Sequence, residues 1–183
     1  MDEKEAIALN TSLAASRILS LGAHRLSSSL DTFSGWLLAG FGAVFGLLIA
    51  NFGTVSEHIN ASNLKLGAGL FLVAAAFAAA QKLLAAYVAA GTAAGEDGRG
   101  IGKELASGAI PLDVDSMYEQ VRQGLFWPLS SFNARMTAKA KAGDFAVTGR
   151  HHAKTSQIQF LLVLFQSGLS IASAACVVRG IAI

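Results

Sequence analysis

TFSGWLLAGFGAVFGLLIANFGTVS, residues 32–56, runs for 25 residues without an aspartate, glutamate, lysine or arginine. A second stretch, residues 155–178, has 24 residues without a charge, and residues 66–95 are interrupted only by Lys82. The hydrocarbon core of a bilayer is about 30 Å thick, and a helix needs roughly 20 apolar residues to cross it. The three stretches therefore predict an all-α, polytopic membrane protein with three transmembrane helices.

The composition of the whole chain agrees with this prediction. Of 183 residues, 53% are hydrophobic and 14% are charged, and the mean hydropathy is +0.51. Ordinary soluble domains have about a quarter of their residues charged. The net charge of +2 is small and spread along the chain, so it indicates no nucleic-acid surface. We expect no nucleic-acid partner and no cofactor.

The apolar stretches divide the chain into four segments. Neither proline, Pro111 or Pro128, lies inside an apolar stretch, so we expect uninterrupted helices. The connection between the first two spans is short, which predicts an antiparallel hairpin. The segments are an amphipathic N-terminal helix at 1–32, a transmembrane hairpin at 33–95 with spans at 33–53 and 65–94, a cytoplasmic or interfacial helical segment at 96–154, and a third transmembrane helix at 155–183.

Residues 1–32 have the pattern of an amphipathic helix of moderate quality. Ser20 and Ser27 point in other directions than the apolar residues, and Asp31 or Thr32 is placed to cap the next helix. The apolar residues that recur at helical spacing are Leu19, Ala23, Leu26 and Leu30.

Small residues recur every four positions in the first and third spans, and such rows let two helix backbones approach closely in lipid. Gln166 lies near the middle of the third span, and its amide needs a hydrogen-bond partner there. We expect these positions to contact another helix, either of the same chain or of a second copy. They are Gly35, Ala39, Gly42, Ala43, Gly46, Ala50, Gln166, Gly168 and Ala172.

The polar segment predicts two short helices. Asp113 or Asp115 is placed to cap the first, and residues 129–141 form the second. The glycine-rich residues 95–102 are expected to end or interrupt the preceding helix. Lys82 is placed either to reach the membrane interface or to lie in a buried polar pathway.

Basic and aromatic residues near the start of the third span predict contacts with lipid head groups. No cysteine or acidic residue lies at ligand spacing from the two histidines, so we expect no metal site. The expected interface residues are Trp127, Arg150, His151, His152 and Lys154.

The distribution of lysine and arginine predicts the orientation. Residues 1–32 and 95–154 hold 11 of these side chains, and the opposite side holds Lys65 and Arg179. Cytoplasmic loops carry the excess of basic residues, so the N-terminus is expected in the cytoplasm and the C-terminus outside. The abundance of alanine and glycine favours a bacterial source, and therefore the inner membrane.

No catalytic motif stands out, and the first and third spans contain no ionisable carboxylate or amine. The leading hypothesis is a non-enzymatic membrane protein that acts through helix contacts, with lipids, other membrane subunits or its own copies as partners. One alternative is a small effector or immunity-type protein that forms or blocks a pore through Gln166 and Lys82. Another is an enzyme or ligand sensor that uses residues 103–154.

Overall fold

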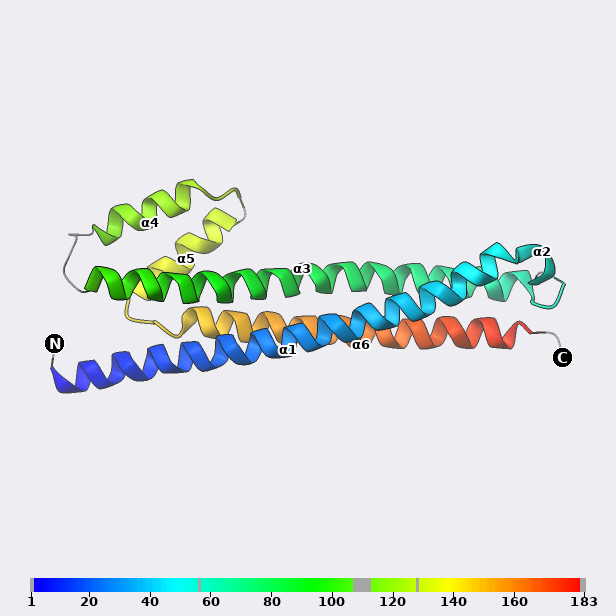
Figure 1. The fold of residues 1–183 in the computed structure, drawn as a ribbon, viewed down its shortest axis with the longest axis horizontal. Coiled ribbons are helices and arrows are strands. Elements are labelled where there is room, and N and C mark those ends of the chain that lie inside the picture. Colours follow the sequence, from blue (N-terminus) through cyan, green and yellow to red (C-terminus); the bar gives the residue numbers. More distant parts are fainter. Residues whose placement is uncertain (1, 56, 107–112, 128, 182–183) are drawn as a thin grey trace. The chain divides into compact units, whose positions relative to one another are not determined.

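The computed structural model describes residues 2–55, 57–106, 113–127 and 129–181. Within these residues the chain has no strand, and a single isolated antiparallel bridge joins Ile59 to Ile181. The prediction of an all-α chain is confirmed. Its helices are α1 (Glu3–Ala50), α2 (Phe52–Val55), α3 (Ala61–Ala106), α4 (Val114–Gln123), α5 (Leu129–Lys141) and α6 (Val147–Arg179) (Figure 1).

Three helices are long and apolar enough to cross a membrane: α1, α3 over residues 61–101, and α6. Large apolar side chains on these helices point outward, and Trp36 is 74% exposed. A soluble protein rarely leaves so many large apolar side chains uncovered. These features confirm the prediction of three potential membrane-spanning helices.

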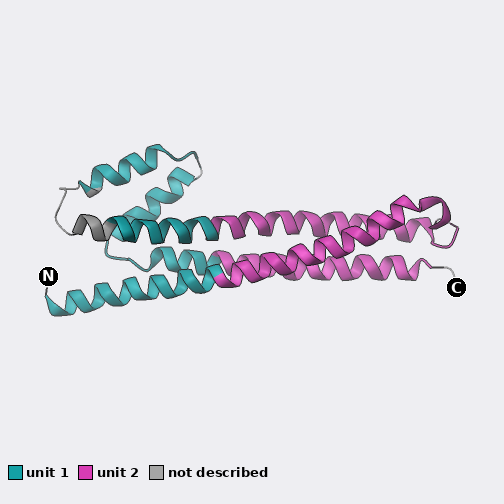
Figure 2. Ribbon diagram, viewed as in Figure 1, with its two compact units in different colours: residues 1–24, 88–154 teal, residues 25–87, 155–183 magenta. Residues whose placement is uncertain are grey.

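The chain divides into two compact units (Figure 2). Unit 1 comprises residues 1–24 and 88–154, and unit 2 comprises residues 25–87 and 155–183. The helices α1, α3 and α6 each contribute residues to both units, whereas α4 and α5 belong to unit 1 alone.

Unit 2 contains segments of the long helices α1, α3 and α6, together with the short α2. The rings of Phe45 in α1 and Phe71 in α3 stack with centroids 5.0 Å apart, and Asp31 of α1 pairs with Lys82 further along α3. Residues later in α1 therefore contact residues earlier in α3, so the two helices are antiparallel. The expected hairpin is confirmed.

Two expected helix boundaries are wrong. The helix α1 continues through Asp31 and Thr32 without a break. The Asp31 carboxylate accepts a hydrogen bond from Lys82 instead of capping a helix, and the Thr32 hydroxyl donates to the carbonyl of Ser28 one turn earlier. The helix α3 likewise runs through the glycine-rich residues 95–102. Each glycine costs a helix only about 1 kcal/mol relative to alanine, so several weaken a helix without ending it.

The start of α4 and the bounds of α5 lie where the sequence predicts, whereas α4 ends at Gln123. The Asp113 carboxylate accepts hydrogen bonds from the backbone N–H groups of Asp115 and Ser116, which is an N-cap of α4. The helix α5 spans residues 129–141, as expected, and Lys141 near its end pairs with Asp115 of α4. Pro111 and Pro128 lie outside the described residues.

Candidate functional site

Unit 2 holds fully buried amide side chains between its helices, and these make its most distinctive site. Gln166 in α6 is 1% exposed. The Ser34 hydroxyl of α1 donates to Gln166 Oε1 at 2.6 Å, and Gln166 Nε2 donates to the Ser34 carbonyl at 3.1 Å. An unpaired amide in hydrocarbon would cost several kcal/mol, so this mutual pair fixes α6 against α1.

A second polar layer joins all three helices of unit 2. Gln159 Nε2 of α6 donates both to Gln81 Oε1 of α3, at 2.8 Å, and to the Ser27 carbonyl of α1, at 3.1 Å. Gln81 Nε2 donates in turn to Asp31 Oδ1 at 3.1 Å, and Lys82 Nζ lies 2.8 Å from the same oxygen. Lys82 is therefore not an isolated charge, because its counter-ion comes from α1.

This second layer is less completely bonded than the first. The Ser27 hydroxyl and Gln159 Oε1 are both buried, and neither has a hydrogen-bond partner among the described residues. The Ser27 backbone carbonyl, not its side chain, supplies the acceptor for Gln159. The Ser27 side chain therefore contributes small size to this position more than hydrogen bonding.

The helices α3 and α6 approach each other closely at Gly67. The Ser173 hydroxyl donates to the Gly67 carbonyl at 2.6 Å. A Cβ atom on Gly67 would lie 2.9 Å from Val177 Cγ2 and 3.0 Å from the Ser173 carbonyl oxygen. Only glycine fits this position without moving α6.

The sequence carries a signal for these layers that our sequence reasoning missed. In α1 and α6 a series of buried polar residues recurs every seven positions, which is the repeat of helices packed side by side in a coiled coil. Reading for polar rather than apolar residues at this period would have found them. The two series are Ser20, Ser27 and Ser34 in α1, and His152, Gln159, Gln166 and Ser173 in α6.

The expected apolar face of residues 1–32 is only partly right: Ala23 is buried, and Leu19 and Leu30 are half-buried. Ser20 and Ser27, which the sequence placed away from the apolar stripe, are buried, whereas Leu26 is exposed. The small side chains of Ser20, Ala23 and Ser27 let α1 pack closely against the neighbouring helices.

Most of the predicted small-residue positions face outward. A Cβ atom added to Gly35, Gly46 or Gly168 would meet nothing within 4 Å, whereas one on Gly42 would lie 3.7 Å from Phe71 Cζ. The expected close packing within the chain is therefore absent at the first three. Ala39, Ala43 and Ala50 are exposed, and Ala172 is half-buried.

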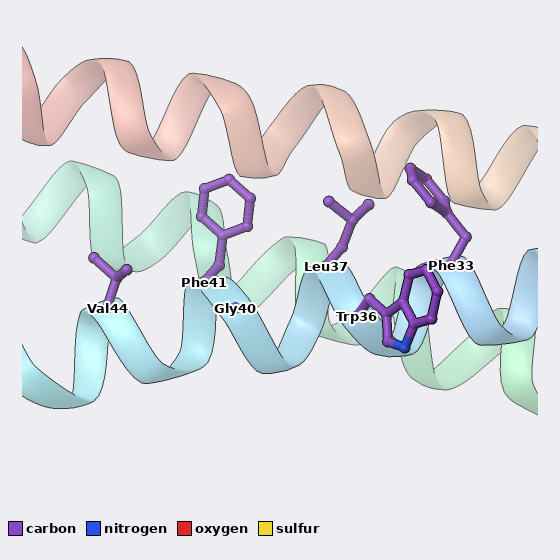
Figure 3. A pocket seen from close by; sticks show the side chains of 6 residues that line it. All are labelled: Phe33, Trp36, Leu37, Gly40, Phe41 and Val44. Carbon is purple, nitrogen blue, oxygen red and sulfur yellow. The ribbon is translucent and has the colours of Figure 1, made fainter.

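A shallow apolar hollow of about 320 Å³ lies along the outward side of α1 in unit 2. Figure 3 shows Phe33, Leu37 and Phe41 projecting from one side of the helix, with Trp36 beside them. Gly40 is among the lining residues and adds no side chain. This surface suits an acyl chain or an apolar helix.

The predicted interface residues all belong to unit 1. Trp127 is 81% exposed, and Arg150 pairs with Asp144. The His151 ring lies 4.5 Å from the Phe132 ring of α5. Lys154 is exposed, whereas His152 is buried, with Nδ1 3.1 Å from the Ser20 hydroxyl. The structure thus separates His152 from the exposed members of the set.

Both histidines precede residue 155, where the charge-free stretch begins. Burial lowers the pKa of His152, and the neighbouring His151 lowers it further. Burial, followed by the positive charge of Lys154, lowers the pKa of His151. Both imidazoles are therefore mainly neutral at pH 7.

No group of three or more histidine, cysteine, aspartate or glutamate side chains is arranged to hold a metal ion in the described part of the chain. Comparison with protein-family models, curated proteins and solved structures finds no match.

Proposed function

We propose that this chain is a non-enzymatic integral membrane protein that acts through helix contacts, as a subunit of a membrane assembly or as a homo-oligomer. The observation that carries the proposal is the opposite placement of polar and small residues in unit 2. Gln81, Gln159 and Gln166 are buried and bonded to the chain's own groups, whereas Gly35 and Gly46 face outward.

This placement favours contacts between helices of different chains. Helices in a membrane associate mainly through close packing of small residues and interhelical hydrogen bonds. The amide N–H groups of Gln81, Gln159 and Gln166 already donate to acceptors inside the bundle, so contacts between chains would rest on close packing of the outward faces. The row that contains Gly46 supplies such a face, and the shallow hollow that Trp36 borders lies on the same helix.

The same contacts support the pore hypothesis less well. Gln166 and Lys82, which would line a pathway, are bonded to Ser34 and Asp31 of the same chain. A pathway through an oligomer would need a row of polar side chains on the outward faces. Lys82 is exposed but paired with Asp31, and its exposed neighbour Leu83 is apolar. We therefore favour assembly over conduction.

The deciding experiment compares two outward glycines. Gly46→Leu places a large side chain in the small-residue row of α1, whereas Gly69→Leu makes the same change on α3 outside any such row. Neither glycine has an atom within 4 Å of an added Cβ, so both variants should fold. Energy transfer between donor-labelled and acceptor-labelled copies in lipid vesicles, and the particle mass in nanodiscs, report assembly.

We expect Gly46→Leu to lower the energy transfer and the particle mass, and Gly69→Leu to leave both at the wild-type level. A wild-type chain that is monomeric and without foreign subunits in nanodiscs would contradict the proposal. So would equal behaviour of the two variants.

A further inference from the structure

A basic hollow of about 290 Å³ lies in unit 1, between α5 and the first turns of α6. Half of its lining side chains are cations and none is an acid. The rings of Phe132 and His151, 4.5 Å apart, form part of its wall. The lining residues are Phe132, Arg135, Met136, Lys139, Val147, Arg150, His151 and Lys154.

The cations are arranged in a way that is unfavourable without an anion. Arg135 and Lys139 are four residues apart on α5, and Arg150 and Lys154 are four residues apart on α6. Like charges at this spacing are neighbours on a helix surface and repel each other. Arg150 also lies in the first turn of α6, where the helix dipole is positive. An anion in the hollow would relieve each of these repulsions.

Internal acids neutralise only part of this charge. Asp144 pairs with Arg150. Arg135, Lys139 and Lys154 form no ion pair with any acidic side chain that the structure describes. By contrast, the two other cations of the α4 and α5 region, Arg122 and Lys141, pair with Glu119 and Asp115. The hollow therefore keeps a concentrated positive charge.

We propose that this hollow binds a phosphate group. Arginine offers a planar fork of N–H donors that matches phosphate oxygens, and lysine adds point charges around them. The four cations come from two helices, so they surround a ligand rather than line one side of it. Met136 and Val147 give the hollow an apolar wall.

Phosphate groups occur both in lipid head groups and in soluble compounds. Lys154 directly precedes the charge-free stretch 155–178, so a lipid head group is near at hand. A soluble phosphate compound would be recognised by the same donors. The inference is independent of the proposed helix contacts, because the hollow lies in unit 1 and the outward glycines of the proposal lie in unit 2.

The experiment uses the full chain in nanodiscs of phosphatidylcholine. In one arm inorganic phosphate is titrated at constant ionic strength and binding is followed by calorimetry. In the other arm phosphatidic acid replaces part of the lipid and the shift in melting temperature is followed. The test variant is Arg135→Gln with Lys139→Gln. The matched control is Lys4→Gln with Arg17→Gln, which removes two exposed cations from α1, outside the hollow.

We expect saturable binding in at least one arm, weakened about tenfold or more in the test variant, since each lost contact is a charge-assisted hydrogen bond. The control should bind as the wild type does. Response only to phosphatidic acid identifies a lipid head group, and response to inorganic phosphate identifies a soluble ligand. If circular dichroism shows that the test variant is misfolded, Lys154→Gln takes its place. No saturable response in either arm, or an equal loss in the control, would overturn the proposal.

Discussion

Replacing Gly67 with alanine tests the close approach of α3 and α6. The added Cβ would lie 2.9 Å from Val177 Cγ2 and 3.0 Å from the Ser173 carbonyl oxygen. Comfortable contact between carbon atoms begins at about 3.5 Å. The Val177 methyl group can move by rotation, but the carbonyl oxygen moves only with the backbone of α6. That backbone is also held by the hydrogen bond from the Ser173 hydroxyl to the Gly67 carbonyl.

The magnitude follows from two opposing terms. Forcing an extra methyl group into a packed site costs about 1–3 kcal/mol. Alanine in place of a helical glycine gains about 1 kcal/mol. Gly67→Ala should therefore destabilise the fold by about 0–2 kcal/mol. Gly46→Ala gains the same helix propensity and meets nothing within 4 Å, so it should stabilise the fold by about 1 kcal/mol.

The difference between the two variants isolates the packing, because the gain in propensity cancels. It should be about 1–3 kcal/mol in the free energy of unfolding. Denaturant titration in detergent micelles, followed by circular dichroism, measures it. If the two variants unfold within about 0.5 kcal/mol of each other, α3 and α6 do not approach closely at Gly67. The argument from glycine geometry would then fail.

Three further outcomes follow from the polar contacts and the charge distribution. Ser34→Ala should destabilise the fold by about 1–2 kcal/mol, because it leaves Gln166 Oε1 without its donor. Ser27→Ala should be neutral or slightly stabilising, because that hydroxyl has no partner among the described residues. Unfolding titrations that rank the two serines the other way would contradict the layer geometry. Folding lowers the pKa of His152, so the unfolded chain binds more protons than the folded chain below pH 6.5. The free energy of unfolding should therefore fall from pH 7 towards pH 5, by at most about 1.4 kcal/mol per pH unit. His152→Gln should flatten this dependence. In intact cells carrying Cys176→Ala, a membrane-impermeant thiol reagent should label Ser62→Cys and reach Ser131→Cys only after permeabilisation; the reverse pattern would overturn the orientation inferred from the basic residues.

The sequence predicts the helices of this chain well where a single physical effect dominates. The charge-free stretches fix three long helices because their length matches the bilayer, and the Asp113 cap fixes the start of α4 because its carboxylate satisfies two free N–H groups. The prediction from sequence is wrong at Asp31, where two effects compete. Its short polar side chain is typical of a helix cap, but a lysine 51 positions later in the sequence provides a stronger partner.

The packing face could not be deduced from hydropathy. In water an apolar stripe marks the buried side of a helix, and that reasoning assigned the stripe containing Leu26 to the contact face. The structure buries Ser20 and Ser27 instead. Hydropathy does not mark the contact face here, because two of the buried positions, Ser20 and Ser27, are polar. Residue size and hydrogen-bonding capacity mark the contact face instead, and both favour serine and glutamine there.

The spacing of the buried amides explains how α6 finds its register on α1. Ser27 with Gln159 and Ser34 with Gln166 are each 132 residues apart, so both layers form in the same alignment. If α6 shifted by one heptad, Gln159 would face Ser34, and Gln166 would face Phe41, whose side chain has no hydrogen-bonding group. A glutamine left unpaired in hydrocarbon costs several kcal/mol, more than any contact that a shift between apolar helix faces would change. The polar layers therefore select one register of α6 on α1 among several of similar apolar packing.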